Sequence, residues 1–152
     1  MANTFSRIYI QIVFAVKGRE NLIDKKWEKE LHGYIATIIK NKEQKSIIVN
    51  GMEDHIHAFV GLKPTMLVAD LVRDIKCNSA KFINDRKFVK GKFNWQEGYG
   101  AFSYAHSQIG SVYNYILNQK ERHKTNTFKE EYLSFLKKFE IEYDTKYLFE
   151  WM

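Results

Sequence analysis

Two histidines separated by one residue, His55 and His57, are the residues of this chain whose types and spacing most directly suggest chemistry. They begin an apolar run that predicts a β-strand. Because side chains alternate along a strand, both imidazoles should leave one face and point outward while Ile56 faces the core. There they could hold one metal ion, but a competent site also needs a third ligand and open positions for substrate. The alternative is a pair of half-buried strand histidines that bind nothing.

A polar stripe on a predicted helix offers the third ligand. The stripe consists of Ser111, Tyr115, Gln119 and Arg122, which recur every three or four residues. Tyr115 and Gln119 therefore lie one turn apart, whereas Tyr113 lies about 200° from Tyr115 around the helix and is expected in the core. A tyrosine hydroxyl, with a pKa of about 10, is a poor nucleophile unless nearby charge favours the phenolate or the target phosphate is strongly polarised. Without the histidine pair, the stripe would be an ordinary solvated helix face.

The elements that must position these residues follow from hydrophobic periodicity. Residues 5–16 alternate in a way that predicts a long, largely buried strand. Apolar residues then recur every three to four positions, which predicts an amphipathic helix that Asp24 caps and that ends near Lys40. After Pro64, Thr65 is expected to cap a second helix with a buried apolar stripe.

A hairpin should lie between these two helices. The apolar runs 46–49 and 56–62 are joined across Asn50-Gly51, a dipeptide that readily adopts the positive φ angles of a turn, so the two runs should pair antiparallel. Asp54 directly precedes the histidine pair. It either orients one imidazole as a carboxylate partner or simply ends the hairpin turn.

The second half of the chain supplies a last strand and more helices. The aromatic segment 93–104 predicts a strand with a bulge or kink near Gly98 and Gly100, and Ser107 is placed to cap the helix that carries the tyrosine. Residues 128–139 predict a further helix. The order β-α-β-β-α-β followed by helices predicts the α+β class. It indicates a ferredoxin-like, RNA-recognition-like antiparallel sheet that is covered on one face and leaves the other face for a site.

Composition fits one globular domain. With 152 residues, of which 45% are hydrophobic and one is proline, the chain should form a single domain over 1–152, with a core of about 5–125 and a C-terminal helix and tail over about 126–152. The single cysteine excludes an internal disulfide. Together with the lack of a signal-peptide pattern or a membrane-spanning run, it indicates a cytoplasmic protein with no membrane partner. The net charge of +6 favours a polyanionic partner without identifying it.

Positive side chains are the candidates for contact with a polyanion. They are Arg73, Lys76, Lys81 and Arg86 on the second helix and Arg122 after the tyrosine. These residues could bind the phosphates of a nucleic acid, or they could form an ordinary solvated surface. Among the aromatic residues, Tyr99 and Phe102 could be either base-stacking platforms or part of the core.

Taken together, these motifs resemble the HUH single-tyrosine transposases of bacterial and archaeal insertion sequences, which move as single-stranded DNA. The resemblance rests on the histidine–hydrophobe–histidine motif at 55–57 and the Tyr-x-x-x-Gln motif at 115–119. The segment 95–103 and the triplet 14–16 of the opening strand are also similar to that family. The likeness covers roughly residues 5–125, and the combination of motifs in this order is specific.

The resemblance implies a mechanism and a set of partners. His55, His57 and Gln119 would bind Mg²⁺ or Mn²⁺, which withdraws charge from the scissile phosphate while Tyr115 attacks it in line. The implied products are a 5′-phosphotyrosine and a free 3′-hydroxyl, formed without a nucleotide cofactor. The implied partners are single-stranded DNA with hairpin ends and a second copy of the chain, in a homodimer whose active sites are composed in trans.

The sequence leaves other functions open. A replication initiator or relaxase uses the same histidine and tyrosine chemistry, but typically has further domains or a third motif histidine. A related domesticated protein that acts on repeated palindromes and no longer moves is another option. The same fold pattern also suits an RNA-recognition-like binding module without catalysis, or a metal-dependent nuclease that uses water as its nucleophile.

Overall fold

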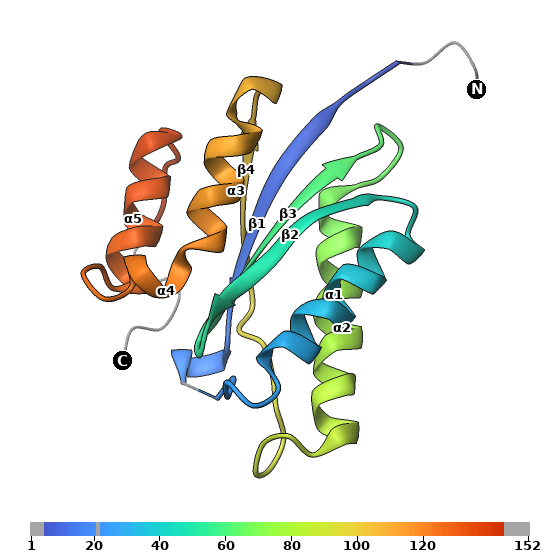
Figure 1. The fold of residues 1–152 in the computed structure, drawn as a ribbon, viewed down its shortest axis with the longest axis vertical. Helices are drawn as coiled ribbons and strands as arrows, with labels where there is room; N and C mark the ends of the chain where they lie inside the picture. The colour runs from blue at the N-terminus through green and yellow to red at the C-terminus, as the bar shows by residue number, and fades with distance from the viewer. Residues whose placement is uncertain (1–4, 21, 145–152) are drawn as a thin grey trace.

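A four-stranded antiparallel sheet with helices on both faces forms the protein (Figure 1). The computed structural model describes residues 5–20 and 22–144. The strands are β1 (Ile8–Ala15), β2 (Lys45–Met52), β3 (His55–Leu62) and β4 (Gly100–Tyr104), and the helices are α1 (Glu28–Asn41), α2 (Val68–Arg86), α3 (Ile109–Leu117), α4 (Gln119–Arg122) and α5 (Phe128–Lys138), with short 3₁₀ turns at Lys17–Arg19 and His106–Gln108. The strand order β2-β3-β1-β4 confirms the predicted ferredoxin-like α+β fold, because β1 and β2 flank β3 in a split β-α-β unit.

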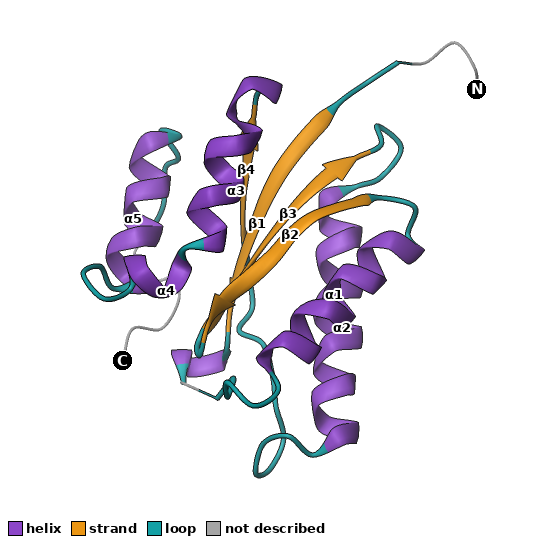
Figure 2. Ribbon diagram, in the orientation of Figure 1, coloured by secondary structure: helices purple, strands orange, loops and turns teal. Residues whose placement is uncertain are grey.

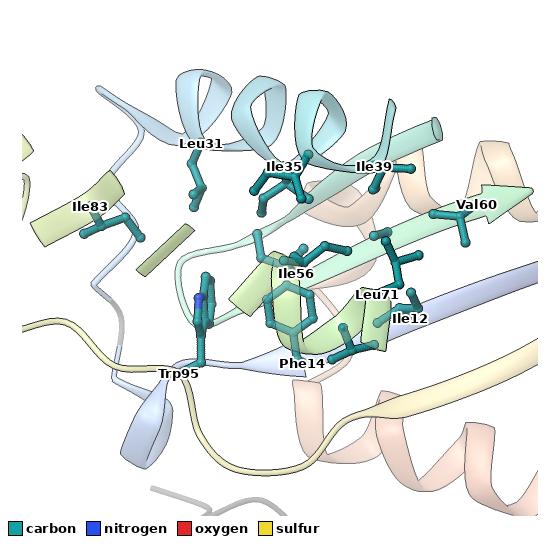
Figure 3. Packing of buried hydrophobic residues seen from close by; sticks show 14 of the residues in the cluster. Ile12, Phe14, Leu31, Ile35, Ile39, Ile56, Val60, Leu71, Ile83 and Trp95 are labelled. Carbon is teal, nitrogen blue, oxygen red and sulfur yellow. The ribbon is translucent and has the colours of Figure 1, made fainter. Parts of the chain in front are cut away.

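The main core lies between the sheet and the helices α1 and α2 (Figure 3). Ile12 and Phe14 of β1 face this core, as the alternation of the first strand predicts, and β3 contributes Ile56 and Val60. The buried stripes of the helices include Leu31, Ile35 and Ile39 of α1 and Leu71, Val72, Ile75 and Ile83 of α2. Each fully buried aliphatic side chain contributes about 1.5–3 kcal/mol to folding. This face therefore fixes the register of β3 and the side of the sheet on which the histidines lie.

The second face of the sheet is covered as well, by α3, α4 and α5 (Figure 2). One apolar cluster there joins Val13, Ala15 and Phe102 of the sheet to Phe128, Tyr132, Phe135 and Leu136 of α5, and another joins Tyr9 and Phe59 to Val112 and Ile116 of α3. The prediction of an open face is therefore wrong, because the apolar stripes of α3 and α5 are buried against that face. Within the described ranges, no helix combines the length and the apolar character needed to cross a bilayer.

The hairpin of β2 and β3 turns at residues 53–54, not at Asn50-Gly51 as predicted. Both Asn50 and Gly51 lie within β2. A Cβ at Gly51 would come within 2.2 Å of a carbonyl oxygen of β3, so glycine permits a close approach of the two strands. The Asn50 side chain donates a hydrogen bond to the carbonyl of Ile116, 2.9 Å away, and so ties β2 to α3. The Asn50-Gly51 pair is therefore accounted for by these two contacts within the sheet layer, and not by a role in a turn.

Both α1 and α2 begin later than predicted. The Asp24 side chain accepts a backbone N–H two residues ahead at 2.8 Å, which forms a turn, and α1 starts only at Glu28. α2 starts at Val68, and Leu67 rather than Thr65 occupies its N-cap position. The packing of each helix is set by its apolar stripe, so the later starts leave the predicted core faces intact.

The last strand is shorter than predicted, whereas the last helix agrees with prediction. β4 spans only Gly100–Tyr104. Before it, Trp95 makes an isolated bridge to Val16, and Gly98 adopts a φ of 88°, which interrupts the extended backbone. The helix predicted over 128–139 is confirmed as α5.

The predicted tyrosine helix is two helices. It breaks at Asn118, where φ is −97° and ψ is 27°, and this residue separates α3 from α4. Ser107 lies in the preceding 3₁₀ turn and does not cap α3. Tyr113 is 39% exposed and not in the core as predicted, because Val112 and Ile116 supply the buried contacts of α3.

Candidate active site

His55 and His57 lie on β3, on the face of the sheet opposite the main core, as the strand alternation predicts. The expectation that they point outward is wrong, because the helices of the second layer bury them to 1% and 0% exposure. The His55 ring stacks on Phe128 of α5, with ring centroids 3.9 Å apart. The imidazoles therefore point into a covered site between the sheet and α5.

Glu131 of α5 is the residue on which this site converges. Its Oε1 atom lies 3.2 Å from Nε2 of His57 and 3.4 Å from Nε2 of His55. The same oxygen lies 3.2 Å from Nε2 of His123, the residue that follows α4. Three imidazoles and one carboxylate thus share a small buried volume.

Glu131 is not among the residues that the sequence motifs predict for the site, although its position in the sequence carries a signal. Glu131 lies three residues after Phe128 and four residues before Phe135, so a carboxylate shares the apolar face of α5. Glutamate is almost never fully buried unless it is paired. A glutamate on an apolar stripe therefore indicates a buried partner, but the helix alone does not say which partner.

Tyr115 and Gln119 contact the second oxygen of the same carboxylate. The Tyr115 hydroxyl donates a hydrogen bond to Oε2 of Glu131, and Nε2 of Gln119 donates to that oxygen over 3.1 Å. Oε1 of Gln119 lies 3.2 Å from Nε2 of His55. The fold therefore brings together all four residues that the sequence predicts for catalysis and metal binding, with His57 as the fourth.

Two contacts hold the junction of α3 and α4, which separates the tyrosine from the glutamine. Asn50 of β2 donates to the carbonyl of Ile116, in the last turn of α3. On the other side of the junction, Lys120 pairs with the buried Glu28 of α1 at 2.9 Å. Gln119 lies between these two anchors, so its amide is held against the histidines.

The buried carboxylate and imidazoles shift one another's protonation. Burial opposes a charge on His55, but the hydrogen bonds and charges of Asp54 and Glu131 outweigh it and raise the pKa of His55 to about 9. Burial lowers the pKa of His57, so this imidazole is neutral. Burial also opposes ionisation of Glu131, yet the imidazoles of His57, His123 and His55 hold the pKa of its carboxyl well below the usual range. Glu131 therefore stays ionised.

Tyr115 is a neutral phenol at the edge of a cavity. Burial, followed by the charge of Glu131, raises the pKa of Tyr115 well above its ordinary value. The guanidinium of Arg122 lies 4.4 Å from the centroid of the tyrosine ring. Beside the ring is a cavity of about 440 Å³, whose lining includes Gln11, Tyr104, Ser111 and Lys138. Tyr115 itself is part of the lining of this cavity.

Asp54 fills both of the roles that the sequence leaves open. It is the second residue of the turn at 53–54, and its Oδ1 lies 2.7 Å from Nδ1 of His55. A carboxylate in this place holds the ring proton on Nδ1 and leaves Nε2 directed at Glu131 and Gln119.

The donor set fits a divalent metal ion. One ligand atom each from His55, His57 and Glu131 can be chosen so that all lie within 4.8 Å of one another, and the amide oxygen of Gln119 adds a fourth donor next to His55. Imidazole and carboxylate donors together suit a transition metal such as Mn²⁺, whereas Mg²⁺ favours oxygen ligands. The sequence predicted Gln119 as the third ligand, and the structure adds Glu131 to the candidates.

The predicted DNA contacts fall in two places. Arg122 lies at the site, over the tyrosine ring. Arg73, Lys76, Lys81 and Arg86 lie on α2, in the layer on the opposite side of the sheet (Figure 1). Among the described residues, Arg73 pairs with Asp70, Lys76 donates to the backbone carbonyls of Gln96 and Gly98, and Arg86 pairs with Glu30. The fold does not bring the α2 cations to the histidines.

The two aromatic candidates for base stacking, Phe102 and Tyr99, differ in exposure. Phe102 is 1% exposed and belongs to the second core, so it is not a base-stacking platform, whereas Tyr99 is 38% exposed. An RNA-recognition-like module stacks bases on an open sheet face. Here α3 and α5 cover that face, which argues against the binding-module alternative.

A ferredoxin-like sheet that places a His-x-His pair beside a tyrosine of a neighbouring helix is the arrangement expected from the sequence motifs. Residues 4–119 match the family model described as IS200-like transposase. The chain belongs to this family of DNA transposases, whose general activity is DNA cleavage and transfer in recombination. A search of curated proteins gave no match.

Two solved structures share the fold. A candidate transposase from Deinococcus radiodurans R1 aligns with a TM-score of 0.64 and 18% identity, over 78% of this chain and 95% of its own. A REP-associated tyrosine transposase bound to a REP hairpin aligns with a TM-score of 0.60 and 11% identity, over 81% of this chain and 73% of its own. At these identities, the similarity shows a common architecture.

Proposed function

We propose that this transposase cleaves and rejoins single-stranded DNA at the ends of an insertion sequence through a 5′-phosphotyrosine formed on Tyr115. The observation that carries this proposal is the convergence of Tyr115, Gln119 and the histidine pair on the two oxygens of Glu131. A phenol, two imidazoles and a carboxylate in one buried cluster supply a nucleophile and a metal-binding site for phosphodiester transfer.

Each residue has a role in this reaction. His55, His57, Glu131 and Gln119 would hold Mg²⁺ or Mn²⁺, which when bound withdraws charge from the scissile phosphate. Tyr115 attacks that phosphate in line, so that a bond from its oxygen to phosphorus forms while the bond from phosphorus to the 3′ oxygen breaks. Glu131 accepts the hydrogen bond of the phenol and so orients its oxygen. The phenol loses its proton as its oxygen bonds to phosphorus, and the leaving oxygen takes up a proton to become a 3′-hydroxyl. Attack by a 3′-hydroxyl on the phosphotyrosine reverses these steps and rejoins DNA.

The proposed substrate is single-stranded DNA that carries a hairpin. The net charge of +6 and the fold that this chain shares with a hairpin-bound transposase support this substrate. Arg122, beside the nucleophile, would contact a phosphate of the cleaved strand. Arg73, Lys76, Lys81 and Arg86 are proposed to contact flanking DNA that reaches the layer of α1 and α2.

Excision requires one cleavage at each end of an element, whereas the chain has one His-x-His pair and one matching tyrosine. We therefore infer a homodimer with active sites composed in trans, although within a single chain Tyr115 contacts its own Glu131. A tethered dimer with His57→Ala in one chain and Tyr115→Phe in the other tests this arrangement. Assembly in trans leaves one intact site and residual cleavage, whereas complete inactivity shows assembly in cis.

Incubation with labelled single-stranded DNA from the element's ends and Mn²⁺ or Mg²⁺ tests the chemistry. The native chain should give a protein–DNA adduct that survives denaturation. Tyr115→Phe should abolish the adduct, while Tyr113→Phe, on the exposed side of the same helix, should retain it. Cleavage by Tyr115→Phe without an adduct would refute the tyrosine mechanism and indicate a water nucleophile.

A further inference from the structure

Gln11 is a fully buried glutamine in the middle of β1, on the face of the sheet that carries the histidines. Its neighbours on that face, Tyr9 and Val13, belong to apolar clusters. Nε2 of Gln11 lies 2.8 Å from Nδ1 of His57, and its Oε1 accepts a hydrogen bond from the Tyr104 hydroxyl over 2.8 Å. Burial of an amide is unfavourable unless its polar atoms are bonded, so these two contacts account for a glutamine at an otherwise apolar position.

The contact with Gln11 determines which nitrogen of His57 carries the proton. A neutral imidazole has one N–H, and its other nitrogen is an acceptor. When the Gln11 amide donates to Nδ1, the proton of His57 is on Nε2, where it is donated to Oε1 of Glu131 over 3.2 Å. In this tautomer Nε2 has no lone pair for a metal ion.

The other tautomer of His57, with its proton on Nδ1, needs the oxygen of the Gln11 amide in place of its nitrogen. If Nε2 of His57 binds a cation, Nδ1 carries the proton and requires an acceptor. Rotation of the Gln11 amide by half a turn presents its oxygen to Nδ1 and its nitrogen to Tyr104. A phenol hydroxyl can accept as well as donate, and Tyr104 lines the cavity, so its hydrogen has space to turn away. The amide can therefore reverse without a change in packing.

His55 shows the contrast. Its Nδ1 faces the carboxylate of Asp54 at 2.7 Å, which can only accept, so in the neutral ring the proton is on Nδ1 and Nε2 is the nitrogen that can bind a metal ion. Nδ1 of His57 instead faces the side-chain amide of Gln11, which can donate through its nitrogen or, after rotation, accept through its oxygen. We propose that Gln11 is a positioning residue of the metal site, whose amide turns over when Nε2 of His57 binds a divalent cation. This inference rests on the metal-binding part of the proposed function.

Titration of Mn²⁺ into the chain without DNA, followed by the electron paramagnetic resonance signal of free Mn²⁺, tests the inference. Gln11→Met removes the acceptor for Nδ1 and should weaken Mn²⁺ binding by about 10- to 100-fold. Gln11→Glu supplies a permanent acceptor and should bind Mn²⁺ at least as tightly as the native chain. Gln44→Met is the matched control, because Gln44 is a buried glutamine bonded to the backbone of Lys63 beyond the opposite end of β3, and it should leave the affinity unchanged.

The outcomes separate the inference from the function on which it rests. Native affinity in Gln11→Met, or an equal loss in Gln11→Met and Gln11→Glu, overturns the inference alone. A native chain that binds no Mn²⁺ overturns the metal site together with it. A second measurement uses the native chain, so it does not depend on whether a variant folds. Long-range ¹H–¹⁵N NMR reports which nitrogen of the His57 ring carries the proton. The ring proton should be on Nε2 without metal and on Nδ1 with Mg²⁺, and an unchanged position in saturating Mg²⁺ overturns the reversal.

Discussion

Acidification should destabilise the protein through His32, a histidine of α1 outside the candidate active site. Its Nε2 atom is buried and has no hydrogen-bond partner among the described residues. Lys120 of α4 and Glu28 of α1, which pair at 2.9 Å, both act electrostatically on this imidazole. A proton on His32 would place a charge in the seam that anchors α4, the helix that begins with Gln119.

The magnitude follows from the pKa of His32. Burial lowers it from 6.5 to about 4, an effect that Glu28 opposes and Lys120 reinforces. The unfolded chain therefore takes up a proton near its ordinary pKa, whereas the folded protein does not until about pH 4. Stability is unaffected above the ordinary pKa and is lost as pH falls from there to about 4. At about 1.36 kcal/mol per pKa unit, the full loss is about 3 kcal/mol, of which about 2 kcal/mol is reached at pH 5.

Urea unfolding at about pH 7.5 and about pH 5 measures this loss. The difference in free energy of unfolding between the two pH values should be about 2 kcal/mol smaller for His32→Gln than for the native chain, because glutamine does not titrate. His106→Gln is the control, since His106 is exposed, and it should lose as much stability as the native chain. An equal pH dependence in His32→Gln and the native chain would refute the reasoning.

Three further outcomes are expected. Glu131→Gln should weaken Mn²⁺ binding by at least about 10-fold, because it removes the charge of a proposed ligand. The exposed Glu130→Gln keeps its capping bond as an amide and should bind Mn²⁺ like the native chain; equal affinities of the two variants would remove Glu131 from the proposed ligand set. Gly51→Ala should lower the free energy of unfolding by about 1–3 kcal/mol, because its Cβ would meet a carbonyl oxygen at 2.2 Å, whereas Gly33→Ala, with open space around it in α1, should raise it by up to about 1 kcal/mol. Urea titration measures both, and a neutral Gly51→Ala would contradict the close approach. Arg122→Gln should weaken single-stranded DNA binding and reduce the slope of log affinity against log salt by about 0.7, the share of one phosphate, and an unchanged slope would place Arg122 away from the DNA.

Local periodicity predicted which side chains share a face. Alternation along β3 separates His55 and His57 from Ile56, and helical spacing puts Tyr115 and Gln119 on one stripe. These relations depend only on the repeat of a strand or a helix, so neighbouring residues are enough to predict them.

Element ends were harder to predict, because contacts between distant residues decide them. The Asn50-Gly51 pair looks like a turn, but its glycine allows two strands to approach and its asparagine bonds to the end of α3, sixty-six residues ahead. The break at Asn118 falls between the contacts of Asn50 with α3 and of Lys120 with α1. Sequence windows of a helix turn or a hairpin contain none of these partners.

The sequence by itself determined the fold class, the face of β3 that carries the histidines, and the residue types of the candidate metal site and of the proposed nucleophile. The tertiary structure decided the environment of that chemistry. α5 covers the sheet and places Glu131 between Tyr115 and the histidines, and β1 places Gln11 behind His57. The physical reason is burial. A carboxylate or an amide is stable in a covered layer only when partners meet its polar atoms, and here the partners come from β1, β3, β4 and the junction of α3 and α4, which only the folded chain brings together.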